Sequence, residues 1–340
     1  MQVRAPTNIA LIKYWGKADS ESNLPLNSSL SLTVDINAFY TETTIEHSSS
    51  LEMTLNEASI TPTSRMLKVI SALSPENSNF KIQSRNNFPT AAGLASSASG
   101  LAALTFAVAN LVSLEASPEE LSKVARLGSG SASRSMFGGL VEWVKGDSHE
   151  SSYSVQLMNG GFLDELRLLM IVVSSQEKEV GSTQAMNMQS ELARERAEYR
   201  APERLQRIKK AFEEHNFEEI ANITMEDSDD LHYIAENSEF SVHYMNDTSR
   251  KIRDLVKEFN REEVLAAYTF DAGPNAYILT RKTHINTLVR YLLSVLKVKS
   301  GEVFTEETLN NLEELQSTAK YEIEALFEVK VSSTGPVRTN

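Results

Sequence analysis

The first sixty residues carry short apolar and alternating runs that are typical of β-strands. Four segments show this pattern: Ile9–Trp15, Ser31–Ile36, Tyr40–Ile45 and Leu51–Leu55. Such runs, rich in β-branched and aromatic residues, predict an N-terminal region built of strands. A helix is expected next, over Met66–Leu73, and should end before a proline.

Small apolar residues dominate the segment that follows. Ala98–Val112 (ASGLAALTFAVANLV) is long enough to be a buried helix. Ser117–Glu120 (SPEE) predicts another helix start, because serine caps, proline suits the first helical position and Glu120 lies where a capping box needs an acid. Strands follow at Val141–Val144 and Leu168–Ser174, the second as a nearly continuous, buried apolar run.

The character of the chain changes after about residue 175. The remaining pattern predicts charged, amphipathic helices at 184–216 and 248–260, strands at Ala266–Phe270 and Ala276–Thr280 around a DAGPN turn, helices at 283–297 and 305–317, and a closing strand at Tyr321–Ser332. We therefore expect two domains, 1–178 and 179–340, although no Pro/Gly-rich linker marks the boundary.

Length and composition narrow the class of protein. With 340 residues, 41% of them apolar, the chain is long enough for two domains with sizeable cores. There is no run of 18 apolar residues and the start, MQVRAPTNIALIKYWGK, is polar and charged, so neither a membrane span nor a secretory leader is expected. The absence of cysteine excludes a disulfide framework, a thiolate nucleophile and a thiolate zinc site, and fits the cytoplasmic location that we expect.

The net charge of −13 argues against general binding to nucleic acid or to an anionic membrane, which both need concentrated positive charge. It does not exclude an anionic small substrate. The pocket for such a substrate would have to be locally basic or rich in main-chain N–H donors.

Pro89–Ser99 (PTAAGLASSAS) runs into the predicted buried helix and suits close approach of a ligand. Small residues let the main chain come near, and a helix N-terminus offers unpaired N–H groups that suit phosphate. Ser96, Ser97 and Ser99 add hydroxyls within reach of phosphate oxygens or Mg²⁺. No GK[ST] follows, so this is not a Walker loop. An ordinary Ala/Ser-rich helix start is the alternative.

Two further segments combine glycine with a cation. Gly128–Gly139 (GSGSASRSMFGG) surrounds Arg134 with glycine and serine, a composition that can wrap a carboxylate or phosphate against the guanidinium. Lys13–Lys17 (KYWGK) ends an apolar strand, where a lysine can neutralise a phosphate or lower the pKa of a neighbouring acid. The alternatives are a turn with a surface arginine, and lysines that reach out to solvent.

Thr269–Asn275 (TFDAGPN) places Asp271 between a strand end and a tight Gly-Pro turn. A carboxylate held rigidly there can serve as a general base for a substrate hydroxyl. Aspartate in a turn more often bonds to its own main chain, which is the alternative. The six histidines show no metal-ligand spacing and are expected at the surface or hydrogen-bonded in the core.

Together these segments resemble one family. Four motifs carry the resemblance, in order and in approximate spacing: NIALIKYWGK at 8–17, NNFPTAAGLASSASG at 86–100, GSGSASRSMFGG at 128–139 and TFDAGPNA at 269–276. They are similar to the motifs of the diphosphomevalonate decarboxylases, members of the GHMP superfamily of small-molecule kinases. The kinases usually have glycine where this chain has Ala95, and that alanine, with KYWGK and DAGPN, indicates the decarboxylase branch.

The resemblance implies an ATP- and Mg²⁺-dependent reaction of isoprenoid biosynthesis. The family phosphorylates the tertiary 3-hydroxyl of mevalonate 5-diphosphate, loses that phosphate and expels carbon dioxide, giving isopentenyl diphosphate, ADP and phosphate. It also implies an α+β fold of two domains, one like domain 2 of ribosomal protein S5 and one ferredoxin-like, with the active site between them. A homodimer that binds small molecules, and neither nucleic acid nor a membrane, is expected.

The resemblance assigns roles to individual residues. Asp271 would accept or orient the hydroxyl proton, Lys13 would keep Asp271 ionised, and Arg134 would clamp the substrate carboxylate; Ser131 is the further catalytic candidate. The predicted substrate-binding residues are Asn8, Tyr14, Trp15, Gly16, Lys17, Ser129, Gly130, Ser131, Arg134, Ser182 and Thr183. The predicted ATP-binding residues are Pro89, Ala92, Gly93, Leu94, Ala95, Ser96, Ser97 and Ser99, with Ser97 the candidate metal ligand.

Some positions depart from the family pattern. Where the family often has two adjacent lysines, this chain has Glu177-Lys178-Glu179, and a family arginine has two candidate counterparts, Arg65 and Lys68. The loss of positive charge near the diphosphate leaves open a decarboxylase of mevalonate 5-phosphate or of the 3,5-bisphosphate. The presence of both Asp271 and Lys13 argues against two more distant functions, a mevalonate 3-kinase and a non-catalytic sensor of an isoprenoid phosphate.

Overall fold

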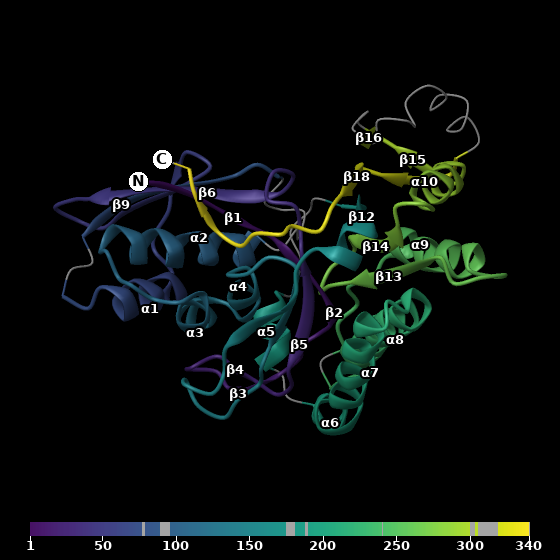
Figure 1. Ribbon diagram of the computed structural model, residues 1–340, viewed down its shortest axis with the longest axis horizontal. Helices are drawn as coiled ribbons and strands as arrows, with labels where there is room; N and C mark the ends of the chain where they lie inside the picture. Colours follow the sequence, from purple (N-terminus) through teal and green to yellow (C-terminus); the bar gives the residue numbers. More distant parts are fainter. Residues whose placement is uncertain are drawn as a thin grey trace.

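A computed structural model describes residues 1–76, 79–88, 96–174, 181–187, 190–239, 241–299, 303–304 and 319–339. The described chain forms two α+β halves that lie side by side, with helices α1 to α4 in one and α7 to α10 in the other (Figure 1). None of its helices is both long and apolar enough to cross a bilayer.

The N-terminal half contains two main sheets. The six-stranded sheet has the order β19-β1-β6-β9-β7-β8, formed by Val337–Arg338, Gln2–Pro6, Tyr40–His47, Phe80–Asn86, Glu52–Leu55 and Ala58–Ser59. The four-stranded sheet has the order β11-β10-β5-β2, formed by Ser154–Met158, Leu140–Trp143, Ser29–Thr33 and Asn8–Ile12. A small ribbon of β3 (Lys17–Asp19) and β4 (Leu24–Pro25) follows the KYWGK segment.

Helices pack beside the first sheet, and α2, which is rich in small residues, lies directly against its strands β1 and β6. The helices are α1 (Ser64–Leu73), α2 (Ser96–Leu111), α3 (Pro118–Gly128) and the short α4 (Gly130–Arg134). The predicted buried helix is confirmed as α2, whose alanines at 98, 102, 103 and 107 are fully buried. The capping box at the start of α3 is confirmed too, since the Ser117 N–H donates to the Glu120 carboxylate and the Glu120 N–H donates to Ser117 Oγ.

The C-terminal half is built on a five-stranded sheet of order β13-β14-β12-β18-β16, formed by Ala266–Phe270, Ala276–Arg281, Leu166–Val172, Ala325–Val329 and Val303–Phe304. A parallel pair, β15 (Leu296–Val298) and β17 (Tyr321–Ile323), lies beside it. The helical segments are η2 (Gly161–Glu165), α5 (Ser182–Asn187), α6 (Glu191–Glu195), η3 (Arg196–Arg200), α7 (Ala201–Glu213), α8 (Phe217–Asn237), α9 (Asp247–Phe259) and α10 (Ile285–Leu293).

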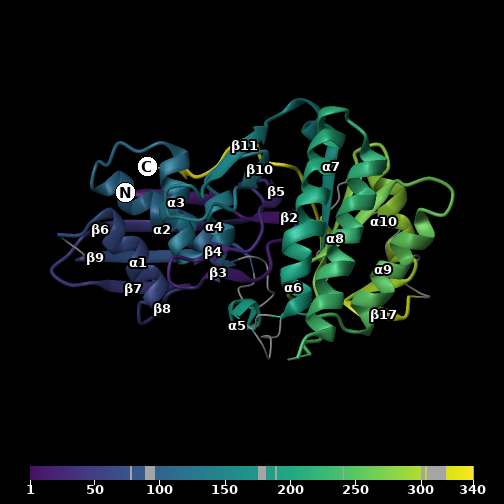
Figure 2. The same ribbon diagram turned by 90° about the horizontal axis from the view of Figure 1, so that it is seen from below.

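Strand β12 is buried on both faces, as its continuous apolar run predicted. Leu168 and Met170 pack with β2, β5, α7 and α8, whereas Leu169 and Ile171 pack with α9 and α10 on the other side. One apolar cluster therefore contains side chains from both halves. Helices α7 and α8 run alongside each other next to β2 in Figure 2, and α9 and α10 lie on the far side of α8.

Several predicted elements are corrected by the structure. The helix expected over 283–297 ends at Leu293, because residues 296–298 form β15. The single closing strand expected over 321–332 is two strands, which pair with different partners on either side of Glu324. The helix expected over 184–216 is divided into α5, α6, η3 and α7, and α8 was not predicted. The helix expected over 305–317 lies outside the described residues.

The last described residues return to the N-terminal half. Val331 forms a β-bridge with Val34, and β19 pairs with β1. Figure 1 shows this segment crossing from β18 towards the N-terminus. The predicted boundary at residue 178 stays a prediction, with β12 already in the second half and β19 back in the first.

Candidate functional site

Two motifs far apart in the sequence meet at the junction of the halves. Lys13 directly follows β2, and Asp271 directly follows β13. The Lys13 amine, Nζ, donates to Asp271 Oδ1 at 2.6 Å. The Lys13 side chain is 4% exposed and that of Asp271 is 37% exposed, so the carboxylate has an open side while the amine is enclosed. Burial lowers the pKa of Lys13, and the charge of Asp271 opposes this shift.

Arg134, at the end of α4, lies close enough to Lys13 and Asp271 to feel their charges. Its guanidinium donates to Ser29 Oγ at 2.9 Å and to Asn8 Oδ1 at 3.1 Å. Asn8 is fixed in turn, because its amide donates to the Ser131 carbonyl and to Ser135 Oγ. Within the described chain the Nε of Arg134 is buried and makes no hydrogen bond. Burial lowers the pKa of Arg134, and Tyr14 and Asp271 oppose that shift.

Gly130 allows two aromatic rings to pack at the start of α4. A Cβ at this position would lie 2.4 Å from the Trp143 ring and 3.1 Å from the Tyr14 ring. The two rings meet edge to face, 4.8 Å apart, and Arg134 lies over the Tyr14 ring at 5.5 Å. Only glycine leaves enough room here, so its position in the motif is explained by the packing of Trp143 and Tyr14.

Trp15 and Gly16 complete the turn after β2. Trp15 is buried against α5 and α8, and its ring meets that of Tyr244 at 6.3 Å. Gly16 has φ +86°, a conformation that L-residues with a Cβ rarely adopt. The two residues direct the chain towards Lys17 and β3.

A second group of cations surrounds Lys17. Burial lowers the pKa of Lys17, and the nearby positive charges of Arg65 and Lys68 lower it further. Lys68 is tied to the β3–β4 turn by a hydrogen bond to the Glu21 carbonyl. Both candidates for the family arginine therefore lie near Lys17, in the locally basic environment that an acidic chain needs for an anionic ligand. Ser129 and Ser131 share a hydrogen bond of 3.0 Å between their hydroxyls.

The predicted phosphate-binding segment is described from Ser96 onwards, where α2 begins. Pro89, Ala92, Gly93, Leu94 and Ala95 lie outside the described residues, as do Glu177, Lys178 and Glu179. Ser97 is exposed, whereas Ser99 is buried with its hydroxyl 2.7 Å from that of Thr41. A cavity of about 160 Å³ adjoins Ser96 and Ser97 and is also lined by Thr63, Arg65 and Asn86.

Two further predictions concern Ser182 and Thr183, which form the first turn of α5. Their side chains lie outside the described part of the structure. Among the described residues no three His, Cys, Asp or Glu side chains cluster as a metal site. A magnesium ion at the start of α2 would depend on hydroxyl, water and phosphate oxygens, which is the usual way that Mg²⁺ is held with a nucleotide.

Three buried polar residues beside Lys13 were not predicted from the sequence: Arg196, Asp227 and His232. The spacing of charged residues in the sequence could have indicated Arg196 and Asp227. Arginines recur at positions 196, 200, 204 and 207, about one helical turn apart, and acids stand at 226, 227 and 230. Matching stripes of opposite charge are typical of two helices that pack together. His232 is enclosed by Tyr244 and Phe270. Among the described residues neither of its ring nitrogens has a hydrogen-bond partner, so it differs from the hydrogen-bonded core histidine that was expected.

Comparison with known proteins gives a consistent result. Two family models match: "Diphosphomevalonate decarboxylase-like N-terminal domain" over residues 5–154 and "Mevalonate 5-diphosphate decarboxylase C-terminal domain" over residues 168–336. The diphosphomevalonate decarboxylase of Candida albicans is 42% identical over 299 residues, which cover 81% of this chain and 83% of the relative.

Solved structures agree with these matches. The mevalonate diphosphate decarboxylase from Trypanosoma brucei is 31% identical, with a TM-score of 0.88 over 99% of this chain and 96% of its own. A complex of MDDEF with MVAPP, AMPPCP and magnesium is 32% identical, with a TM-score of 0.83 over 99% of this chain and 97% of its own.

Proposed function

The chain belongs to the diphosphomevalonate decarboxylase family, and on that premise we propose how its residues carry out the decarboxylation. The α+β, GHMP-type fold and the enzyme activity predicted from the motifs are both confirmed. The enzyme converts mevalonate 5-diphosphate and ATP to isopentenyl diphosphate, ADP, phosphate and carbon dioxide. A tertiary alcohol is a poor nucleophile and hydroxide a poor leaving group, so ATP is used to turn the 3-hydroxyl into a better leaving group.

Asp271 is proposed to accept or orient the proton of the 3-hydroxyl. The contact of 2.6 Å between Lys13 Nζ and Asp271 Oδ1 is the observation that carries this proposal, because it joins two motifs 258 residues apart. The enclosed cation stabilises the ionised carboxylate, and the open side of Asp271 leaves room for a hydroxyl. Lys13 also offsets part of the negative charge that two phosphorylated substrates bring together.

Arg134 is proposed to hold the substrate carboxylate. A guanidinium has five N–H donors, and Ser29 and Asn8 orient it while Nε makes no bond within the described chain. A carboxylate held in one plane aligns the breaking C–C bond with the orbital that empties at C3 as the phosphate leaves. Ser131, which helps to hold Asn8 through its carbonyl, is proposed to line the same end of the pocket together with Ser129.

The diphosphate end is assigned to the cations around Lys17. Lys17, Arg65 and Lys68 lie near one another, so their mutual repulsion is relieved when a diphosphate binds. Tyr14, Trp15 and Gly16 shape the turn that brings Lys17 to this point, and Gly130 makes room for Tyr14. Ser182 and Thr183 are proposed to close the site from α5.

ATP and Mg²⁺ are proposed to bind at the N-terminus of α2. The main-chain N–H groups and positive end of this helix suit phosphate, Ser97 is exposed there, and the cavity lined by Thr63, Arg65 and Asn86 adjoins it. A solved complex of a similar protein contains AMPPCP and magnesium, which supports the use of ATP and Mg²⁺ by this chain. When bound, Mg²⁺ neutralises charge on the phosphate oxygens, and Ser96 and Ser97 would hold the ion and the phosphates with Pro89–Ala95 and Ser99.

The proposed substrate is tested by measuring ADP and carbon dioxide together. Four parallel assays with ATP and Mg²⁺ contain mevalonate, its 5-phosphate, its 5-diphosphate or its 3,5-bisphosphate. We expect equal amounts of both products from the 5-diphosphate alone. ADP without carbon dioxide would instead indicate a 3-kinase, and preference for another phosphate would overturn the substrate while keeping the class of reaction.

Two properties of the whole enzyme stay predictions. We propose a homodimer, for which light scattering should give twice the mass of one chain, whereas the mass of a single chain would contradict it. The cytoplasmic location expected from the absence of cysteine is likewise a proposal.

A further inference from the structure

The main chain of Lys13 is held by side chains from the opposite half of the molecule. Its N–H donates to Asp227 Oδ2 at 2.7 Å, and its carbonyl accepts from Arg196 Nη2 at 3.0 Å. Asp227 lies on α8 and Arg196 begins η3, and both side chains are completely buried. Since Asp271 holds the amine, three C-terminal residues fix the main chain and the side chain of one N-terminal lysine.

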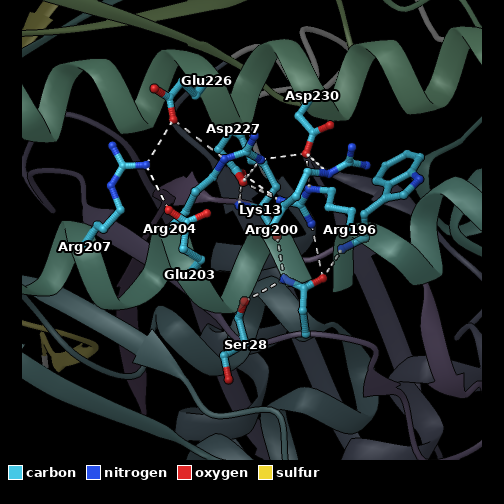
Figure 3. A network of polar contacts seen from close by, with 12 residues as sticks. Lys13, Ser28, Arg196, Arg200, Glu203, Arg204, Arg207, Glu226, Asp227 and Asp230 are labelled. Atoms are coloured by element: carbon cyan, nitrogen blue, oxygen red, sulfur yellow. Dashed lines mark hydrogen bonds and ion pairs between the residues drawn. The ribbon is translucent and has the colours of Figure 1, made fainter. Parts of the chain in front are cut away.

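Arg196 and Asp227 also neutralise each other. Nη2 of Arg196 lies 2.6 Å and 2.8 Å from the two carboxylate oxygens of Asp227. Figure 3 shows this pair within a larger network, in which Arg204 bridges Asp227 and Asp230 at 3.3 Å and 2.6 Å. Buried ion pairs are expensive to desolvate, and apolar side chains of the same volume usually hold helices together at least as well. Helix packing alone therefore does not explain why this network lies against Lys13.

Asn27 of the N-terminal half also holds the main chain of Lys13; we call Asp227, Arg196 and Asn27 together the clamp on Lys13. Its amide nitrogen donates to the Lys13 carbonyl at 2.9 Å, and its oxygen accepts from Arg196 at 3.3 Å and from the Trp15 N–H at 3.4 Å. The main-chain groups of Lys13 and the N–H of Trp15 thus have fixed partners just where the chain leaves β2.

We propose that Asp227 and Arg196 are positioning residues, which fix the main chain of Lys13 so that its amine meets Asp271 when the substrate hydroxyl is activated. This inference rests on the proposed role of Lys13. A shift of the strand end by about 1 Å would break a contact of 2.6 Å, and misplacement on this scale costs up to about 10²-fold in rate.

Asp227 has an electrostatic effect in addition to its hydrogen bond. The charged and titratable groups that face Lys13 are Asp271, Asp227, Arg134, Arg196 and His232. Burial lowers the pKa of Lys13, Asp271 and Asp227 raise it, and Arg134 lowers it. Loss of the Asp227 charge should lower the pKa of Lys13 further, so the amine would lose its proton at a lower pH.

The experiment compares Asp227→Asn with Asp230→Asn. Asp230 lies on the same helix and in the same network, but it forms its ion pairs with Arg196, Arg200 and Arg204 and does not hold the main chain of Lys13. For both variants kcat and KM are measured against pH, together with the thermal midpoint. Asp227→Asn should lower kcat by about 10- to 100-fold, leave KM for ATP within about twofold, and shift the alkaline limb of the kcat profile to lower pH. Asp230→Asn should be destabilised but keep the parent pH profile.

Equal kcat values and equal pH profiles in the two variants would overturn the inference. Lys13→Met separates this failure from a failure of the proposed function. If Lys13→Met keeps the parent rate, the proposed role of Lys13 is wrong; if it is inactive while Asp227→Asn behaves like Asp230→Asn, only the positioning role is wrong.

Arg196→Lys keeps the inference testable should Asp227→Asn fail to fold. Lysine keeps the positive charge beside Asp227, but it lacks the fork that reaches the Asp227 carboxylate and the Lys13 carbonyl together. We expect a lower kcat, while the alkaline limb of the kcat profile stays at the same pH as in the parent. A parent-like kcat in this variant would overturn the inference.

Discussion

At the scale of single residues, Asp271 and Lys13 differ in exposure, and this difference separates their roles. The carboxylate is 37% exposed and the amine 4% exposed, so Asp271 is the more accessible of the two to a ligand. An enclosed cation next to an open carboxylate favours the ionised form of the acid without competing for the ligand. Sequence alone placed both residues near the substrate but could not tell which of them faces it.

Asp271→Asn should therefore bind both substrates and turn over slowly. Asparagine has nearly the same shape but cannot accept a proton, and the loss of a positioned base usually costs about 10²- to 10⁴-fold. Single-turnover assays should show that ADP and carbon dioxide fall together, because the hydroxyl is phosphorylated before the carboxylate leaves. Asp247→Asn, at a fully exposed aspartate on α9, is the matched control and should behave as the parent. A rate within a few fold of the parent would remove Asp271 from the mechanism.

His232 links the same site to the acid stability of the fold. Burial, and then the charge of Lys13, lower its pKa from 6.5 to about 4. Between these pH values the unfolded chain binds a proton that the folded chain does not, so the free energy of unfolding falls as the pH falls. Across this window the loss amounts to roughly 3 kcal/mol for one such group.

Replacement of His232 by glutamine should remove this pH-dependent part of the stability. Urea unfolding at several pH values from about 7 down to about 4.5 measures it for parent and variant. We expect the two stability curves to converge as the pH falls. Parallel curves for His232→Gln would contradict the assigned cause.

At the scale of elements, the sequence predicted those helices and strands whose signals come from neighbouring residues. The capping box of α3, the small-residue run of α2 and the strands on both sides of the DAGPN turn were found from sequence because each has a short-range pattern. Helix α8 was missed because its buried face is not uniformly apolar: Asp227, Ser228 and His232 lie on it among leucine and isoleucine. A periodicity analysis cannot distinguish a polar residue that is buried by a partner from one that is exposed.

The errors at the C-terminal end have a different cause. Residues 296–298 continue the apolar pattern of α10, but they form a parallel pair with residues 321–323. The chain then changes partners at Glu324, whose N–H donates to the Val172 carbonyl, and β18 joins β12 instead. Pairing between segments more than twenty residues apart has no local signature, so the sequence could not separate one strand from two.

At the scale of the whole molecule, charge is distributed so that an acidic chain has a basic site. The net charge is −13. Five cations nevertheless lie close enough to one site to shift the pKa values of its residues: Lys13, Lys17, Arg65, Lys68 and Arg134. Partly buried charges are screened less by salt than exposed ones. The overall charge therefore disfavours nucleic acid, while the local field attracts a small polyanion.

The halves are also coupled through their core, which leads to a prediction about unfolding. One apolar cluster includes Ile9 and Leu32 of the first half with Leu168 and Phe212 of the second, and β19 returns to pair with β1. Neither half can lose its structure without exposing apolar surface of the other, at a cost of about 25 cal/mol per Å². We therefore expect one calorimetric transition, with calorimetric and van't Hoff enthalpies in agreement.

A fragment provides the sharper form of this test. A chain ending at residue 178 would keep β12 but lose β14 and β18, the two strands that pair with it along both edges. The exposed edges and the uncovered face of Leu169 and Ile171, which loses α9 and α10, should leave this fragment unfolded or aggregated, while the full chain melts once. Two resolved transitions, or a folded fragment with dispersed amide signals, would instead show that each half is stable on its own. In that case the clamp on Lys13 would join two independent domains rather than lie within one cooperative unit.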